Sequence, residues 1–214
     1  MEARNGAAKQ GATAPASRTF TEAGRRAQIV QAAIEVIAEM GYAKASFTRI
    51  AKRAGLSSTG MISYHFSGKD DLMREVVIEV LRVADEYMRP RLEAQSTGPG
   101  RLRAYIEANI AVLEEFPQHL PAVVEVLGNV RRDDASMGEL CALMESVVDM
   151  HAQLFREGQE RGEFGEFDPR VMAVALRGSI DAVVNRAVRE PGFDAAVYGR
   201  ELADLFDRAT RRTT

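Results

Sequence analysis

The sequence has very little cysteine and no long apolar run. Its 214 residues include one cysteine, Cys141, so neither an intrachain disulfide nor a cysteine-rich zinc site can form. Residues 1–24 lack the hydrophobic segment of a secretory signal, and no later segment is long and apolar enough to span a bilayer. We therefore expect a soluble cytoplasmic protein with no membrane association, which fits the reduced state of its single thiol.

The motifs of several enzyme classes are also absent. The sequence contains no nucleophile elbow, no glycine loop of the kind that holds phosphates, no paired-histidine metal motif and no cysteine–histidine pair. The three histidines are scattered without the spacing of metal ligands. We therefore predict a protein that is not an enzyme and that needs neither a metal nor a cofactor.

Positive charge is concentrated at the start of the chain. Residues 1–69 contain 10 Lys or Arg and 4 Asp or Glu, a balance of +6, whereas the remaining residues contain 18 and 27, a balance of −9. A basic head on an acidic body indicates a polyanionic partner for the head. An unevenly charged solvated surface is the alternative interpretation.

Strand-like alternation is absent, and apolar residues instead recur at spacings of three and four, which predicts an all-α fold. Gly41 and Gly55 are expected to end helices, Ser46 to cap one, and Pro90 to bend or end another. The break at residues 96–100 and the polar turn at residues 131–136 separate later helices. The expected helices cover about 25–40, 46–54, from Ser57 or Ser58 to His65, 70–89, 101–116, 118–130, 137–161, 170–189 and 195–210.

The first three helices match the plan of a helix-turn-helix unit. Two helices would hold the third by their buried faces, and the outward face of that third helix must be small and polar to enter a major groove. The side chains between Ser58 and Tyr64 fit this demand, with Ile62 and Phe66 turned inward. Basic residues flank the unit and are suited to phosphates: Arg49, Lys52, Arg53 and Lys69.

The segment from Arg25 to Leu72 resembles the N-terminal domain of TetR-family transcriptional regulators. The resemblance is carried in order by Ala33, FTRIA at 47–51, AGLS at 54–57, Gly60, YHF at 64–66 and KDDL at 69–72. It implies a flexible arm at residues 1–24, a helix-turn-helix DNA-binding domain at 25–72, and a helical effector-binding and dimerisation domain at 73–214. Beyond Leu72 the resemblance is one of architecture.

The resemblance also implies which residues contact DNA. Ser63 stands where the family often has an aromatic residue, and the turn after Gly55 is one residue longer than usual, so the base-reading residues stay open. For Tyr64 and Lys69 we expect DNA contact, for Phe66 core packing, and for His65 either role. An arm with Arg18, Arg25 and Arg26 would add contacts or none. The implied DNA-binding residues are Thr48, Arg49, Ser58, Thr59, Gly60, Met61, Ser63, Tyr64, His65 and Lys69.

In TetR-family proteins the middle helices line a cavity for a small effector. Periodicity by itself indicates only that the large apolar residues there are buried, and ordinary core packing is the alternative. His151 is either a hydrogen-bonded core residue or an effector contact. The candidate effector-binding residues are Ile106, Ile110, Phe116, Val124, Leu127, Met144, Val148, His151 and Phe155.

The last two helices carry more apolar surface than one core contact uses, which favours a second subunit on the other side. Small residues at 175, 178, 179 and 182 would allow close helix approach, as in the four-helix dimer interface of related regulators. A monomer with a buried penultimate helix is the alternative. The candidate interface residues are Leu176, Ile180, Val183, Val184, Leu202, Leu205 and Phe206.

Taken together, these features predict a homodimeric transcriptional regulator, more specifically a repressor released from a palindromic double-stranded DNA operator by a small-molecule effector. The identity of the effector, the operator and the sign of regulation stay open. Two alternatives remain: a helical small-molecule carrier or enzyme with a vestigial DNA-binding head, and a nucleoid-type protein that coats DNA without selecting a site.

Overall fold

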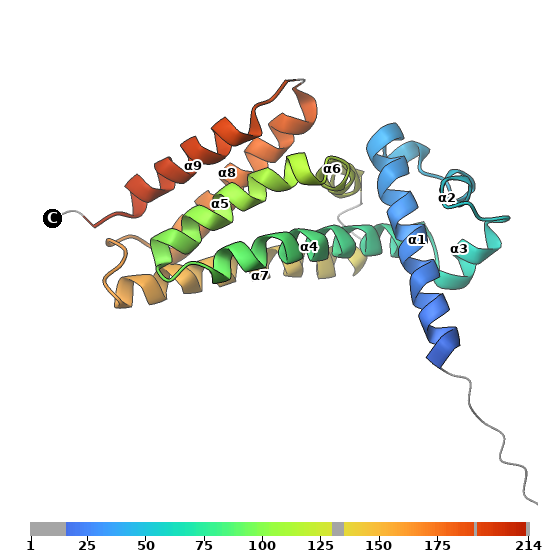
Figure 1. Ribbon diagram of the computed structural model, residues 1–214, viewed down its shortest axis with the longest axis horizontal. Helices are drawn as coiled ribbons and strands as arrows, with labels where there is room; N and C mark the ends of the chain where they lie inside the picture. Colours follow the sequence, from blue (N-terminus) through green and yellow to red (C-terminus); the bar gives the residue numbers. More distant parts are fainter. Residues whose placement is uncertain (1–15, 130–134, 191, 213–214) are drawn as a thin grey trace, which may run out of the picture.

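The computed structural model describes residues 16–129, 135–190 and 192–212, and all regular structure in these ranges is helical, as predicted (Figure 1). A head that contains α1, α2 and α3 lies at one end of an elongated body. None of the helices described is both long enough and apolar enough to cross a membrane. The elements are α1 Ala16–Met40, the 3-10 turn η1 Tyr42–Lys44, α2 Phe47–Arg53, α3 Gly60–His65, α4 Lys69–Glu93, α5 Gly98–Glu115, α6 His119–Asn129, α7 Ala135–Glu160, α8 Pro169–Arg189 and α9 Ala195–Thr210.

Two glycines and one serine set the turns of the head at the predicted positions. Gly41 follows α1 with φ 82° and Gly55 follows α2 with φ 65°, in the left-handed region that glycine adopts without strain. The Ser46 hydroxyl accepts a hydrogen bond from the backbone N–H of Arg49 at 3.4 Å and so caps α2. These local signals place the short helices α2 and α3 beside α1.

Two boundaries in the head differ from the prediction. The first helix begins at Ala16 rather than Arg25, so residues 16–24 of the expected arm are helical, while residues 1–15 lie outside the described ranges. Residues 16–24 contain no proline, and extending an existing helix is far easier than starting one. The third helix begins at Gly60 with Thr59 at its N-cap position, and neither Ser57 nor Ser58 caps it.

The fourth helix belongs to both parts of the molecule. α4 runs through the domain boundary expected at residue 72, and its buried residues Val76, Val77 and Val80 still pack in the core of the head. Pro90 does not end α4, which continues to Glu93. Because Pro90 lies in the last turn, its missing N–H removes only one bond near the helix end, where the cost is small.

The buried residues form two cores, and α6 contributes to both. Ala122 and Val126 of α6 are buried in the core of the head, together with α1, α2, α3 and the start of α4. Val124, on the other side of α6, packs against the core of the body, which is built from α5, α7, α8 and α9. Leu120 packs against both cores. Figure 1 shows α6 nearly end-on between α5 and α1. Because α6 packs in both cores, a displacement of α6 in the body would also change the packing of the head.

Candidate nucleic-acid interface and body sites

Some side chains of the short helix α3 are buried in the core of the head, and others are exposed to solvent. Ile62 is fully buried and Phe66 is almost so, and both belong to the core of the head. On the opposite side, Tyr64 is 71% exposed, and Ser63 and Met61 are also exposed. Ser58 and Gly60 are exposed and Thr59 is half-buried. The head thus presents a face of small, mostly polar side chains on a rigid support, which is what a major groove admits.

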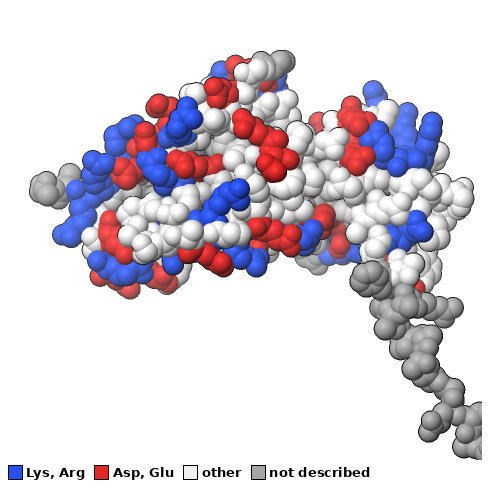
Figure 2. All heavy atoms as spheres, in the orientation of Figure 1, with Lys and Arg blue, Asp and Glu red and all other residues white. Residues whose placement is uncertain are grey.

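Basic side chains lie near this face, but not all of them are free. Thr48 and Arg49 are exposed in the first turn of α2, and the Arg49 Nη1 donates to the Lys44 carbonyl at 2.7 Å. Arg53, expected to flank the site, instead forms ion pairs with Glu35 and Glu39 of α1, at 3.0 Å to Glu35. Figure 2 shows Lys and Arg gathered over the end of the head that contains α2, while both signs alternate on the body.

Lys69 makes its contacts inside the head. Its Nζ donates to the Tyr42 carbonyl at 2.9 Å and lies 4.0 Å from the centre of the Tyr42 ring. Desolvation by burial lowers the pKa of this ammonium. Lys69 thus holds the turn between α1 and α2, and its expected phosphate contact stays a prediction.

The Tyr64 ring is exposed, whereas the His65 ring is half-buried. The Tyr64 hydroxyl lies 3.4 Å from Oε1 of Glu22, and its ring meets the His65 ring edge-on at 5.1 Å. The His65 carbonyl accepts from Nη1 of Arg26 at 2.9 Å. Arg26, expected to belong to the arm, also pairs with Glu75 at 3.0 Å and lies over the Phe66 ring. Tyr64 is thus the aromatic ring that is open to a partner.

Most of the expected effector residues of α5 and α7 are buried together. Ile106, Ile110, Val148 and Phe155 pack in the core of the body with His151 between them in the sequence of α7. Met144 is half-buried on the same helix. The burial of Ile106, Ile110, Val148 and Phe155 agrees with both ordinary core packing and an effector pocket.

Two expected effector residues lie elsewhere. Leu127 packs against the core of the head, because it lies on the side of α6 that faces α1. Phe116 lies half-buried just after α5, with its ring edge-on to Tyr87 at 5.7 Å and 5.3 Å from the His119 ring. The Nδ1 atom of His119 is buried, and none of the residues that the structure describes forms a hydrogen bond with it. Leu127 therefore lies apart from the candidates in the core of the body, since periodicity does not say which core a helix face meets.

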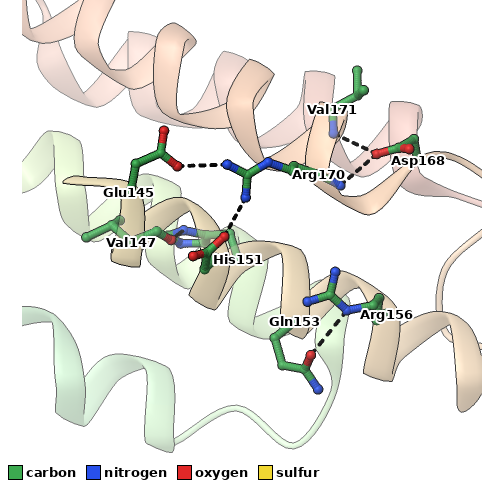
Figure 3. A network of polar contacts seen from close by, with 9 residues as sticks. Glu145, Val147, His151, Gln153, Arg156, Asp168, Arg170 and Val171 are labelled. Atoms are coloured by element: carbon green, nitrogen blue, oxygen red, sulfur yellow. Dashed lines mark hydrogen bonds and ion pairs between the residues drawn. The ribbon is translucent and has the colours of Figure 1, made fainter. Parts of the chain in front are cut away.

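Sequence reasoning missed the polar residues around His151. The His151 Nδ1 lies 2.7 Å from the Val147 carbonyl, and its ring centre lies 4.1 Å from that of Tyr105 on α5. Burial lowers the pKa of His151 to about 4, so the ring is neutral at pH 7 and its Nδ1–H donates to the carbonyl. In Figure 3, Arg170 at the start of α8 reaches Glu145 on α7, at 2.8 Å, above this region. In the sequence, this region is marked by Tyr105 and Arg170, two polar residues that stand among apolar positions.

The expected dimer residues mostly face inward. Leu176, Ile180, Val183, Val184 and Phe206 are buried in the core of the body, and Leu202 packs against it. In the single chain the bulky apolar positions of α8 and α9 form the inner face of each helix, and their place in an interface stays a prediction. Leu205 alone among the set is exposed.

The outward faces of α8 and α9 carry a second apolar stripe. Val171 is 67% exposed and Val174 is 54% exposed. The small residues Ala175, Gly178 and Ala182 continue this side of α8, and all three are exposed. A shallow hollow of about 760 Å³ lies at the far end of the stripe. It is lined by Ala182, Val183, Asn185, Arg186, Arg189, Glu190 and Tyr198.

Comparison with known proteins gives matches over most of the chain. Residues 29–76 match the family of bacterial regulatory proteins called tetR, and residues 99–211 match the C-terminal part of BetI-type transcriptional repressors. The transcriptional regulator BetI 1 of Chromohalobacter salexigens is 40% identical over 40% of this chain and 42% of its own length, so the chain matches less than half of that relative.

Two further matches are regulators from Bacillus subtilis. The fatty acid metabolism regulator of Bacillus subtilis is 28% identical over 83% of this chain and 91% of its own length. The crystal structure of the regulator FadR from Bacillus subtilis, in complex with stearoyl-CoA, superimposes with a TM-score of 0.73 at 22% identity. The superposition covers 84% of this chain and 96% of that one, and so shows a shared fold.

Proposed function

Because this chain belongs to the TetR family of bacterial regulatory proteins, with a BetI-type C-terminal part, we propose that it is a homodimeric, sequence-specific DNA-binding transcriptional regulator. It acts in the cytoplasm as a repressor, and a small-molecule effector releases it from a palindromic operator. The observation that carries this proposal is the exposed face of α3, which is braced from behind by the buried Ile62 and Phe66. The proposal assigns the chain no enzymatic activity.

The exposed face of α3 enters the major groove in this proposal. Met61 and Ser63 face base edges, Tyr64 meets the phosphate backbone, and Thr48 and Arg49 at the start of α2 contact phosphates. Ser58, Thr59 and Gly60 line the entry of α3 into the groove. Their exposure supports these roles, whereas Lys69 serves by fixing the turn at Tyr42.

Two copies of the chain pair through the outward faces of α8 and α9. The exposed stripe at Val171 and Val174 supports this surface, and the small side chains that follow allow two α8 helices to approach closely. Pairing gives the two-fold symmetry that a palindromic operator requires, with recognition helices roughly 34–36 Å apart.

Effector binding in the body changes the spacing of the two heads. The effector and the operator must prefer different conformations of the dimer, since otherwise neither ligand would weaken binding of the other. Both α4 and α6 pack in the two cores, so a shift of either helix reaches the head. The complex of the related FadR with stearoyl-CoA supports a small-molecule site in a body of this fold.

Recovery of genomic DNA fragments by the purified full chain tests the proposal. A regulator retains a few fragments that share an inverted repeat, and its affinity for them falls steeply as salt rises. A carrier with a vestigial head would retain no selected fragment, and a DNA-coating protein would retain fragments of all sequences. Either of these two results would overturn the proposal.

A further inference from the structure

The outward side of α8 carries a projecting part and a hollow part. Val171 and Val174 project from its first half, with exposed fractions of 67% and 54%. Ala182 and Arg186 of its second half line the hollow, together with Tyr198 of α9. The exposed positions 171, 175, 178, 182, 186 and 189 recur at spacings of three and four, so they share one face of the helix. The projecting valines and the hollow therefore look toward the same side of the molecule.

These features are arranged symmetrically about the middle of α8. The small residues Ala175 and Ala182 lie equally far, along the chain, from the midpoint between positions 178 and 179. Val171 lies as far before this midpoint as Arg186 lies after it. A two-fold axis through the midpoint and perpendicular to α8 would pair two antiparallel copies of the helix. It would place Val171 of each copy opposite the hollow of the other, where a valine side chain fills space between Ala182 and Arg186.

The two ends of α8 are complementary in charge under the same symmetry. Arg189 is exposed, and none of the residues that the structure describes forms a hydrogen bond or an ion pair with its guanidinium. Asp168 is exposed at the start of α8, where its Oδ1 accepts hydrogen bonds from the backbone N–H groups of Arg170 and Val171. Position 168 lies as far before the midpoint as position 189 lies after it. The axis that fills the hollow thus also brings Arg189 of each copy to Asp168 of the other.

A parallel arrangement of two α8 helices would use neither kind of complementarity. It would place Arg189 of one copy beside Arg189 of the other, and like charges at an interface oppose pairing. It would also set Val171 against Val171 and leave both hollows open. The antiparallel arrangement satisfies shape and charge with one operation.

We propose that two copies of this chain pack their α8 helices antiparallel about positions 178 and 179, with Val171 of each seated in the hollow of the other and Arg189 of each paired with Asp168. The proposal rests on the homodimer proposed above and specifies how its two copies are aligned. Each copy supplies both halves of the contact, so the contact occurs twice and closes the assembly at two copies.

Disulfide cross-linking of the full chain tests this alignment. All variants carry Cys141→Ser, so that the introduced cysteines are the only thiols. Val171→Cys combined with Arg186→Cys should give a covalent dimer on mild oxidation, because the two positions lie opposite each other. An intrachain bond between them is excluded, since they lie roughly 22 Å apart along one helix. Gel electrophoresis without reductant measures the yield.

Val174→Cys combined with Arg189→Cys is the matched control for this pair. Both positions are exposed on the same side of α8, but in the proposed alignment they lie about 9 Å out of register, beyond the ~7 Å that a disulfide spans. The control should cross-link at least about tenfold more slowly than the first pair. Val171→Cys alone should give no covalent dimer.

The dissociation constant of the dimer, measured by sedimentation, provides a second test. Arg189→Glu places two carboxylates together at each end of the contact and should raise this constant about tenfold. Asp168→Asn keeps the cap of α8, because asparagine caps helices as well as aspartate does. In this background Arg189→Glu should raise the constant about threefold or less, since the repelling carboxylate is gone. Arg156→Glu reverses an exposed charge on α7 and should change nothing.

The possible results separate the alignment from the homodimer itself. No cross-link from Val171→Cys with Arg186→Cys, an equal yield from the control pair, or a covalent dimer from Val171→Cys alone would each overturn the alignment. The same holds if Arg189→Glu acts equally with and without Asp168→Asn. A native chain that stays monomeric at every concentration refutes the proposed homodimer as well, whereas a native dimer with other cross-links refutes the alignment only.

Discussion

Single side chains of α3 serve either the fold of the head or its partner. Ile62 is fully buried, so Ile62→Ala should lower the free energy of unfolding by about 2–5 kcal/mol. Tyr64→Ala should change stability by less than about 0.5 kcal/mol, because this ring is exposed. Its affinity for the selected DNA should nevertheless fall about tenfold. Urea unfolding and DNA titration of both variants provide the two measurements, and a stability loss in Tyr64→Ala matching that of Ile62→Ala would contradict this division.

The buried imidazole of His151 should make stability depend on pH. Its pKa falls to about 4 in the folded chain, below the ordinary 6.5, so the unfolded chain takes up a proton first as pH falls. The folded state should therefore lose about 2 kcal/mol of stability from this group between pH 7 and pH 5. His151→Gln removes the titration, and urea unfolding at both pH values should show a smaller loss in the variant.

His119 remains in both proteins and serves as the internal control. Its pKa is also lowered, mainly by burial, and therefore contributes the same pH dependence to each. An identical change in stability between pH 7 and pH 5 for the native chain and for His151→Gln would show that the His151 ring is not buried as described.

Helix α6 links the head and the body through its packing, and it also contacts the head through the carboxylate of Glu125. The Glu125 Oε2 accepts a hydrogen bond from the Tyr42 backbone N–H at 3.0 Å, on the turn that Lys69 holds from the other side. Glu125→Gln should weaken this bond by about 1 kcal/mol and lower operator affinity about fivefold, because the turn leads into α2.

Charge alone predicts the opposite result for this variant. Removing a negative charge beside DNA raises affinity in general, so a gain in Glu125→Gln would contradict the positioning role of this residue. Glu114→Gln removes the same charge from an exposed position of α5 and should leave operator affinity unchanged.

The outward face of α8 allows a test in which fold and assembly change in opposite directions. A side chain added at Gly178 would meet nothing within 4 Å in the single chain. Gly178→Gln should stabilise the isolated helix by up to about 1 kcal/mol, because glycine is a poor helix former. The same side chain should block close approach of a second α8 and weaken the dimer, as measured by sedimentation at several protein concentrations.

Gly128→Gln at the end of α6 is the matched control for this experiment. A side chain there also meets nothing within 4 Å, and Gly128 lies on α6, outside the two helices assigned to the dimer interface. It should leave the dimer intact. Dimers of equal strength in Gly178→Gln and the native chain would place the interface elsewhere.

Helix positions follow from sequence to within a few residues where a cap or a glycine marks the end. Ser46, Gly41 and Gly55 are such signals, and α8 and α9 begin and end close to the expected residues. The start of α1 at Ala16 follows Pro15 directly, which is a helix-start signal, whereas the prediction relied on the apolar spacing that begins after Arg25. The spacing of apolar residues also does not say which neighbour a helix face meets. Leu127 packs against the core of the head, and the inner residues of α8 pack in the core of the body.

For the site residues too, the sequence predicts local positions but not contacts between residues far apart in the chain. The exposure of Tyr64 and the burial of Phe66 follow from their spacing on one short helix. The hydrogen bond of Lys69 with Tyr42 joins positions 27 residues apart, and the ring contact of Tyr105 with His151 joins α5 to α7. Such pairs depend on how helices pack, and no single-sequence pattern encodes that.

In the proposed arrangement, the whole molecule is a basic reading head on a body that pairs with its copy. The net charge is +6 on residues 1–69 and −9 on the rest, so DNA would attract the head and repel the body. Two heads on one two-fold axis would let a chain with a single short α3 select a site, because each copy would read half of the operator.

DNase I protection on a selected genomic fragment, compared between the native chain and Ser63→Glu, tests this arrangement most directly. We expect the native chain to protect two symmetric half-sites whose centres lie about one helical turn, ~10 base pairs, or a multiple apart. The Ser63→Glu variant, which places a negative charge on the exposed face of α3, should fold normally and protect neither half. A protected region without two-fold symmetry, or one that the variant leaves unchanged, would contradict the proposed role of α3.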